Sequence, residues 1–136
     1  MPTTTRTETL AINTSEDVVR VRQQTRTLAV EAGLSLVDQT KVITAASELA
    51  RNTLDYGGGG QAIMSVLHDG MRKGVELVFE DQGPGIPDLS LALKDGYTTG
   101  KGLGLGLSGA RRLCNEFEIQ STVGVGTKVT IRRWKA

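Results

Sequence analysis

Two stretches near the start of the chain show helical periodicity. From Ser15, a candidate cap, small and apolar side chains recur at helical spacing behind an acidic first turn, and Gly33 ends the pattern. A second pattern runs from about Leu36 to Asp55 and stops at a run of four glycines. We predict that both segments are helices with one buried side.

Most of the remaining segments alternate as strands do. AIMSVL and VELVF are joined by HDGMRKG, which is typical of a hairpin, and FEIQST and TKVTIRRW are separated by VGVG. Residues 1–7 are polar and rich in threonine, so we expect a disordered terminus before a short strand at Thr9 to Ile12. The order of elements lacks a long strand–helix alternation and predicts a two-layer α/β sandwich, one domain over residues 1–136, with a mostly antiparallel sheet and helices on one face.

Composition narrows the set of partners. Hydrophobic residues make up 38% of the chain but aromatic residues only 4%, so the core must consist mostly of aliphatic side chains. A net charge of +1 provides no field for a nucleic-acid backbone or an anionic membrane, and we expect neither as a partner. No signal peptide and no long apolar stretch is present, which predicts a cytoplasmic protein.

Cys114 is the only cysteine and can close no internal disulfide. Its neighbours include Leu113 and Phe117, which favours a small core residue in a reducing compartment. A reactive thiol is the alternative.

Most of the 17 glycines lie between Gly57 and Gly109, and two familiar glycine motifs almost fit there. Gly96 to Lys101 resembles a P-loop, but it is one residue short, and Gly102 stands where a Ser or Thr is required. GLGLSG matches the dinucleotide fingerprint, yet no buried strand precedes it and no acid lies about 20 residues further on. Both assignments fail.

Four separated segments in a fixed order do form a pattern: SELARN, DQGPGIP, TTGKGLGLGL and GVGTKVTI. Together they resemble the N, G1, G2 and closing threonine motifs of the GHKL (Bergerat-fold) ATPases, the superfamily of gyrase B, Hsp90, histidine kinases and MutL. Within that superfamily, ELARN, DQGPGIPD, DGYTTGKGLGLGL and NEF are most similar to the RsbT-like serine/threonine switch kinases, and SpoIIAB-type anti-sigma kinases come next. The resemblance spans about Ser47 to Ile131.

Glu48 and Asn52 carry the catalytic prediction. They are four residues apart, so a helix places their side chains on one face within reach of one phosphate chain. An Asn carbonyl oxygen suits Mg²⁺, which otherwise takes waters and phosphate oxygens, so Asn52 is the predicted metal ligand. Glu48 is the predicted general base for the attacking hydroxyl. Taken alone, both could be ordinary solvated helix residues.

Asp81 ends the strand VELVFED, and a carboxylate there can accept a hydrogen bond from the adenine amino group. The resemblance gives Asp81 the chief role in base recognition. Gly83 and Gly85 are expected to leave room for the base, and Ile86 belongs to the same binding set. Thr127 is expected to support the base contact through its hydroxyl; the alternative is a β-branched residue that starts a strand.

The segment TTGKGLGLGL is predicted to hold the phosphates. Backbone N–H groups at the start of its helix attract phosphate, and glycines allow close contact. Lys101 is expected to meet the γ-phosphate as a point charge, and residues 88–101 resemble the family's ATP lid. The expected phosphate-loop residues are Lys101, Gly102, Leu103, Gly104, Leu105 and Gly106.

The resemblance implies an ATP- and Mg²⁺-dependent protein serine/threonine kinase whose substrates are STAS-domain proteins of a bacterial stressosome. A PP2C-type phosphatase or a sigma factor is a further implied partner. One alternative is a nucleotide-dependent module that sequesters a sigma factor. Another is the ATP domain of a histidine kinase, which the lack of a phospho-accepting helix disfavours. Arg111 and Arg112 follow the phosphate loop and could dock an acidic partner, although a solvated face is the simpler interpretation.

Overall fold

The computed structural model describes residues 2–94 and 106–136. The strands are β1 (Thr3–Ile12), β2 (Gly60–Asp69), β3 (Arg72–Asp81), β4 (Glu116–Thr122) and β5 (Gly126–Trp134). The helices are α1 (Ser15–Glu31), α2 (Leu36–Asp55), α3 (Leu89–Ala92) and α4 (Gly106–Arg112).

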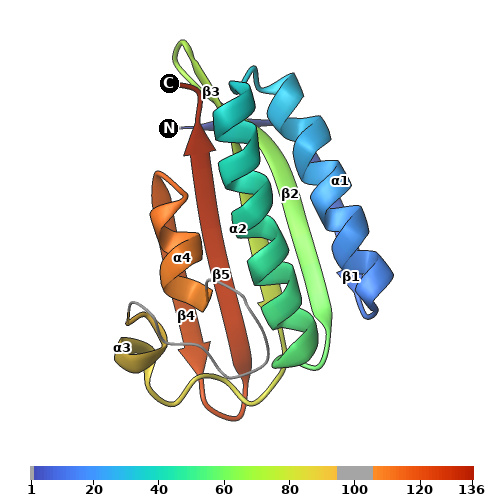
Figure 1. The fold of residues 1–136 in the computed structure, drawn as a ribbon, viewed down its shortest axis with the longest axis vertical. Helices are drawn as coiled ribbons and strands as arrows, with labels where there is room; N and C mark the ends of the chain where they lie inside the picture. The colour runs from blue at the N-terminus through green and yellow to red at the C-terminus, as the bar shows by residue number, and fades with distance from the viewer. Residues whose placement is uncertain (1, 95–105) are drawn as a thin grey trace.

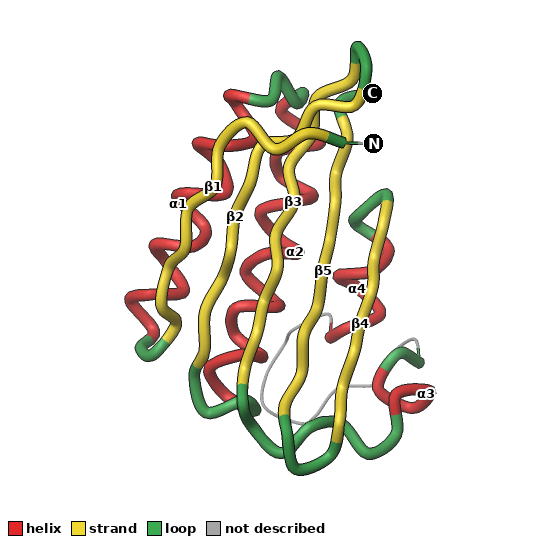
Figure 2. Tube along the Cα trace, turned by 180° about the vertical axis from the view of Figure 1, so that it is seen from behind, coloured by secondary structure: helices red, strands yellow, loops and turns green. Residues whose placement is uncertain are grey.

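One five-stranded sheet has the order β1-β2-β3-β5-β4, with antiparallel pairing between all neighbours. Helices α1, α2 and α4 lie in front of this sheet in Figure 1. The same sheet seen from behind in Figure 2 has no helix over it. The expected two-layer α/β sandwich with helices on one face is therefore confirmed.

Local signals at the helix ends explain where α1 and α2 begin. The cap of α1 is Thr14 rather than Ser15: its hydroxyl accepts from the backbone N–H of Asp17, and the Asp17 carboxylate accepts in return from the Thr14 N–H. Ser35 caps α2 by accepting from the Asp38 N–H at 3.1 Å. Gly33, with φ of 78°, makes the turn between the two helices.

The structure corrects the prediction for the N-terminus. We expected residues 1–7 to be disordered, but β1 already begins at Thr3. It pairs with β2 over its whole length, from Thr3 opposite His68 to Ile12 opposite Gly60. A register shift between Thr4 and Arg6 interrupts the pairing. Backbone hydrogen bonds to β2, together with the high strand preference of threonine, order residues 3–7 of this edge strand, all of which are exposed.

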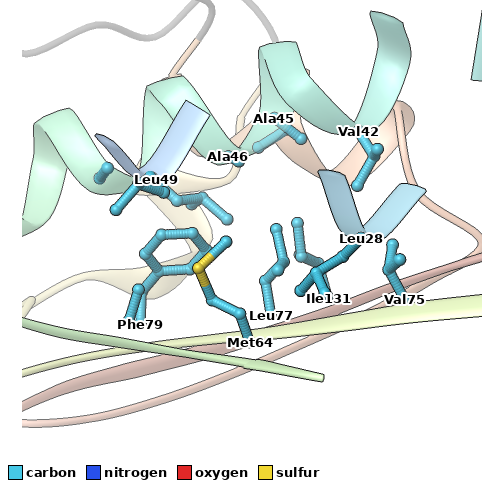
Figure 3. Close-up of a cluster of buried hydrophobic side chains, with 14 of the residues drawn as sticks. Leu28, Val42, Ala45, Ala46, Leu49, Met64, Val75, Leu77, Phe79 and Ile131 are labelled. Carbon is cyan, nitrogen blue, oxygen red and sulfur yellow. The ribbon is translucent and has the colours of Figure 1, made fainter. Parts of the chain in front are cut away.

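The core lies between the sheet and the helices. Met64, Leu77 and Phe79 project from adjacent strands toward Leu49 of α2, as Figure 3 shows. Their alternation along each strand places every second side chain on the helix-covered face. All four are at most 1% exposed. This packing holds α2 on the sheet, and it thereby fixes the position of the residues near the C-terminal end of α2.

A mostly buried ion pair lies at the N-terminal end of α2. Arg133 Nη2 donates to Asp38 Oδ1 at 2.7 Å, across 95 residues of sequence. This hydrogen bond and the positive charge of Arg133 lower the pKa of Asp38 below its usual value. Nearby, burial raises the pKa of Cys114 to about 12, which fits the predicted core cysteine rather than a reactive thiol.

The face without helices is stabilised by a polar row. Arg132 bonds to Glu76 at 2.7 Å and to Glu116 at 3.2 Å, each on a neighbouring strand. Beside this row, Trp134 packs over Gly74, where an added Cβ would lie 2.7 Å from the indole ring. The Arg72 guanidinium stacks on the indole at 4.2 Å from the ring centroid. Side-chain contacts between neighbouring strands therefore stabilise the face of the sheet that carries no helix.

Helix α4 ends at Arg112, and β4 begins four residues later at Glu116. Within the described residues, no helix combines the length and apolar character needed to cross a membrane.

Candidate functional site

A cavity of about 720 Å³ opens between the C-terminal half of α2, the ends of β3 and β5, α3 and the start of α4. This volume is in the range of small-molecule binding sites. It brings together seven of the predicted site residues: Glu48, Asn52, Asp81, Gly85, Ile86, Gly106 and Thr127.

Glu48 and Asn52 lie one turn apart on α2 and both line the cavity. Glu48 also makes a contact that the sequence did not suggest, because its Oε1 accepts from the backbone N–H of Gly106 at 2.8 Å. Gly106 was expected to donate to phosphate, and in this structure it donates to Glu48 instead. The bond ties α2 to the first residue of α4, and among the described residues it engages only one of the two carboxylate oxygens.

Asp81 lines the cavity from the sheet, at the end of β3. Its Oδ1 accepts from the Gly83 N–H at 2.9 Å, which fixes the carboxylate. Gly57 packs directly against it: a Cβ at Gly57 would come within 2.6 Å of Asp81 Oδ2. Asp81 and Thr127 are paired residues on β3 and β5, so their side chains lie on the same face of the sheet.

The structure revises the reason for two glycines. We expected Gly83 and Gly85 to make room for a flat base, but protein backbone fills the space beside each. A Cβ at Gly83 would lie 2.8 Å from the Gly57 backbone, and one at Gly85, with φ of 79°, would lie 2.5 Å from the Thr122 carbonyl oxygen. Gly83 is also absent from the cavity lining. These glycines shape the turn around Asp81.

Ser121 on β4 connects three segments behind the cavity wall. Its Oγ accepts from the Ile86 N–H at 2.7 Å and lies 2.9 Å from Thr127 Oγ1. It also lies 3.3 Å from the Gly126 carbonyl oxygen. The hydroxyl therefore joins the turn after β3 to the start of β5, and it supports both Ile86 and Thr127 without lining the cavity itself.

Part of the predicted site lies outside the described residues: Lys101, Gly102, Leu103, Gly104 and Leu105. Of the expected lid, residues 88–101, the structure describes 88–94. This part contains α3, capped by the Asp88 carboxylate at 3.0 Å from the Leu91 N–H. Leu91 and Ala92 of α3 line the cavity, so this part of the expected lid does border the site.

The chemistry of the lining suits an adenine nucleotide. The sheet contributes the fixed Asp81 carboxylate, an acceptor for an amino group, and on the paired strand the Thr127 hydroxyl. Apolar side chains such as Phe79, Ile86 and Leu107 form part of the lining. Helix α2 contributes the Glu48 carboxylate and the Asn52 amide, whose oxygen suits a hard cation carried with phosphates.

Comparison with known proteins agrees with this geometry. The family described as histidine kinase-, DNA gyrase B- and HSP90-like ATPases matches residues 37–136, which include all of α2 except its first residue, the residues that line the cavity, and β5. The chain belongs to this ATPase family.

Individual relatives narrow the position within the family. The chain is 45% identical over 123 residues to the serine/threonine-protein kinase RsbT of Bacillus subtilis, covering 90% of this chain and 92% of the relative. It is 28% identical over 116 residues to an anti-sigma F factor of Clostridium novyi, covering 78% of this chain and 81% of that protein. The predicted enzyme class, an ATP-dependent protein serine/threonine kinase, is confirmed by the first relationship.

A solved structure supports the fold. The RsbU and RsbW domains of a Mycobacterium tuberculosis protein superpose with a TM-score of 0.63 over 95% of this chain, at 20% identity. This ATPase-family chain spans 32% of that longer polypeptide. At this identity, the superposition shows a shared fold.

Sequence reasoning missed three residues of the site: Gly57, Arg51 and Ser121. Gly57 was interpreted only as the end of a helix, although it packs on Asp81. Arg51 lines the cavity on the same helix as Glu48 and forms no ion pair with any described residue. A signal for Ser121 was present, because it is the polar member of an inward-facing series that begins with two apolar residues on β4.

Proposed function

We propose that this kinase transfers the γ-phosphoryl group of ATP to a serine or threonine hydroxyl of STAS-domain regulatory proteins in a bacterial stress-signalling assembly. The observation that carries the proposal is that Asp81 and Thr127, from the sheet, and Glu48 and Asn52, from α2, line a single cavity. A nucleotide bound with its base near Asp81 extends its phosphates toward Glu48. The similarity to the kinase RsbT supports the choice of a protein hydroxyl as acceptor.

In the proposed reaction, the acceptor oxygen forms a bond to the γ-phosphorus. The bond from that phosphorus to the oxygen that bridges the β- and γ-phosphates breaks at the same time, and ADP leaves. Glu48 holds the acceptor hydroxyl and takes its proton on Oε2, since Oε1 is engaged by the Gly106 N–H at 2.8 Å. Positioning and neutralisation of charge supply the rest of the acceleration. Arg51, which lines the cavity, is a candidate to face the phosphates.

Asn52 is the proposed ligand of Mg²⁺, an ion that brings charge neutralisation to the phosphates when bound. Its side chain lies in the cavity one turn after Glu48, and its amide oxygen is a neutral hard donor. Asn52→Ala should therefore remove most of the Mg²⁺ dependence of ATP affinity, while ADP affinity without metal changes less than about twofold. Titration calorimetry with and without Mg²⁺ measures both. An unchanged Mg²⁺ dependence would exclude Asn52 as the ligand.

The principal test of the proposal is phosphoryl transfer to a partner. The protein is incubated with Mg²⁺, γ-labelled ATP and a STAS-domain protein encoded near it, and the labelled residue is located by mass spectrometry. We expect a phosphoserine or phosphothreonine on the STAS protein. Label that appears on no STAS protein would reject this substrate class. A PP2C-type phosphatase is proposed as a further partner, tested by whether the kinase stimulates its activity.

The second candidate function is sequestration of a sigma factor, and the similarity to the anti-sigma F factor of Clostridium novyi favours it. The two functions differ in what ATP does. A sequestering module holds a sigma factor in an ATP-dependent complex, whereas the kinase releases a phosphorylated product. Sedimentation of the protein with sigma factors in ATP and in ADP, run beside the transfer assay, separates them.

A further inference from the structure

The outward side of helix α2 carries exposed uncharged residues in its first three turns. The helix lies between α1 and α4 in the helix layer, with one side on the sheet and the opposite side toward solvent (Figure 1). On the outward side, Leu36 is 73% exposed and Val37 is 63% exposed. Thr40 and Thr44, in the turns that follow, are exposed as well. We call these residues, Leu36, Val37, Thr40 and Thr44, the α2 stripe.

The two threonines of the α2 stripe use their hydroxyl protons within the helix. Thr40 Oγ1 donates to the Leu36 carbonyl oxygen at 3.0 Å, and Thr44 Oγ1 donates to the Thr40 carbonyl oxygen at 2.8 Å. What these side chains offer to a partner is therefore mainly their methyl groups. Val and Thr are also weaker helix formers than most residues, so helix stability does not explain their presence at exposed positions.

The neighbouring helix α1 presents a different surface to solvent. Its exposed positions include Arg20, Arg22 and Arg26, as is typical of a solvated helix face. The α2 stripe carries no charge. Charged residues are depleted from the centres of protein–protein interfaces, so the composition of the α2 stripe favours contact with another protein.

The α2 stripe leads toward the catalytic end of the helix. Thr44 follows Val37 by seven residues and Glu48 follows it by 11, close to two and three helical turns, so the three side chains share one face. Glu48 also lines the cavity. At 1.5 Å per residue, Val37 lies about 17 Å from Glu48 along the helix axis. A protein that lies along the α2 stripe can therefore reach Glu48 with one of its hydroxyl groups.

Two cations flank this path. Lys41 lies one turn after Val37, and Arg51 lines the cavity three residues after Glu48. Neither forms a salt bridge with a residue that the structure describes. An uncharged stripe between two such cations is complementary to an apolar ridge that has carboxylates beside it.

We propose that the α2 stripe is the docking surface for the protein that accepts the phosphoryl group. The acceptor protein lays an apolar ridge on the stripe, places carboxylates near Lys41 and Arg51, and thereby holds its own serine or threonine near Glu48. Such hydroxyls are present in nearly every protein, so selection of one acceptor requires contacts outside the cavity. The inference rests on the proposed function, because it takes the STAS-domain substrate as the occupant.

The test compares variants at Val37 with a valine of equal exposure elsewhere. Val37→Gln should raise the KM for the acceptor STAS-domain protein about five- to tenfold. Val37→Leu keeps an apolar side chain and should stay within about twofold of wild type. Val125→Gln is the matched control, because Val125 is 65% exposed and lies in the turn between β4 and β5, outside the stripe.

Other measurements separate docking from damage to the enzyme. The transfer rate at saturating acceptor protein, the ATP affinity and the thermal unfolding midpoint of Val37→Gln should all equal the wild-type values. An effect confined to KM shows that the lost contact forms with the acceptor and persists unchanged through the reaction. Thr44→Gln, one step closer to Glu48, should raise KM in the same way.

Three results would overturn the proposal. A wild-type KM in both Val37→Gln and Thr44→Gln rejects the docking surface while the proposed function stands. Sedimentation could instead show a wild-type dimer that Val37→Gln dissociates at unchanged KM, and the α2 stripe would then be a contact between two copies of this chain. If wild type neither binds nor phosphorylates a STAS-domain protein, the proposed function fails, and the docking assignment fails with it.

Discussion

Polar side chains at the two ends of α2 differ in whether they are paired within the protein or face a cavity. At its N-terminal end, Asp38 and Arg133 are paired at 2.7 Å, with side-chain exposures of 11% and 14%. At its C-terminal end, Glu48 and Asn52 face a cavity, and only one carboxylate oxygen of Glu48 has a partner among the described residues. Buried polar groups that find partners within the protein contribute to its stability, whereas those left facing a cavity are available to a ligand. Mutations at the two ends should therefore affect different measurements.

The largest expected effect is on catalysis at the cavity end. Glu48→Gln keeps an oxygen that can accept the Gly106 N–H, so the start of α4 and the ATP affinity should be retained. The amide is a much weaker base, and single-turnover transfer to the STAS protein should fall by about 10²- to 10⁴-fold. Glu118→Gln, on the exposed face of β4, is the control. Transfer at the wild-type rate would exclude Glu48 as the base.

The next effect concerns stability at the other end of α2. Asp38→Ala leaves Arg133 buried without its partner and should lower the free energy of unfolding by about 3 kcal/mol. Asp69→Ala breaks the exposed pair with Arg72, whose side chains are 39% and 52% exposed, and should cost less than about 1 kcal/mol. Urea unfolding measures both variants. ATP affinity at temperatures where Asp38→Ala is folded should stay at the wild-type value, and a clear loss would show that the two ends are coupled.

Asp81→Asn should act on binding alone. The Asn oxygen can keep the Gly83 N–H bond, which turns the amide NH₂ toward the amino group of adenine, so that donor faces donor. We expect ATP affinity to fall about 10- to 100-fold, with less than about 1 kcal/mol change in unfolding free energy. Glu80→Gln, the preceding residue on the other face of β3, controls for the charge change. Wild-type affinity in calorimetry would remove Asp81 from base recognition.

The smallest expected effect is the pH dependence of the unfolding free energy that comes from the pairing of Asp38 with Arg133. Because Arg133 lowers the pKa of Asp38 in the folded protein, the unfolded chain takes up this proton at higher pH than the folded one does. The stabilisation is complete at pH values above the ordinary Asp pKa of about 4, and it is lost as the pH falls through the lower pKa that Asp38 has in the folded protein. The unfolding free energy of wild type minus that of Asp38→Asn should thus be constant from about pH 5 to 8 and shrink below about pH 4. A difference that grows toward low pH would contradict this assignment.

Several features of this protein followed from local sequence. The bounds of α2 were predicted as observed, since the helical repeat and the glycine run that terminates it are both local features of the sequence. The spacing of Glu48 and Asn52 determined that they share a face of that helix. The four glycine-rich and polar segments indicated the ATPase family, which the match over residues 37–136 confirms.

Tertiary structure decided which segments meet. The pairing of Asp38 with Arg133 spans 95 residues, and the bond between Glu48 and Gly106 spans 58. The contact of Gly57 with Asp81 and the link from Ser121 to Ile86 likewise depend on the register of β3, β4 and β5. Local patterns describe the face of each element, but register is set by packing and pairing over the whole sheet, so these contacts exist only once the chain has folded.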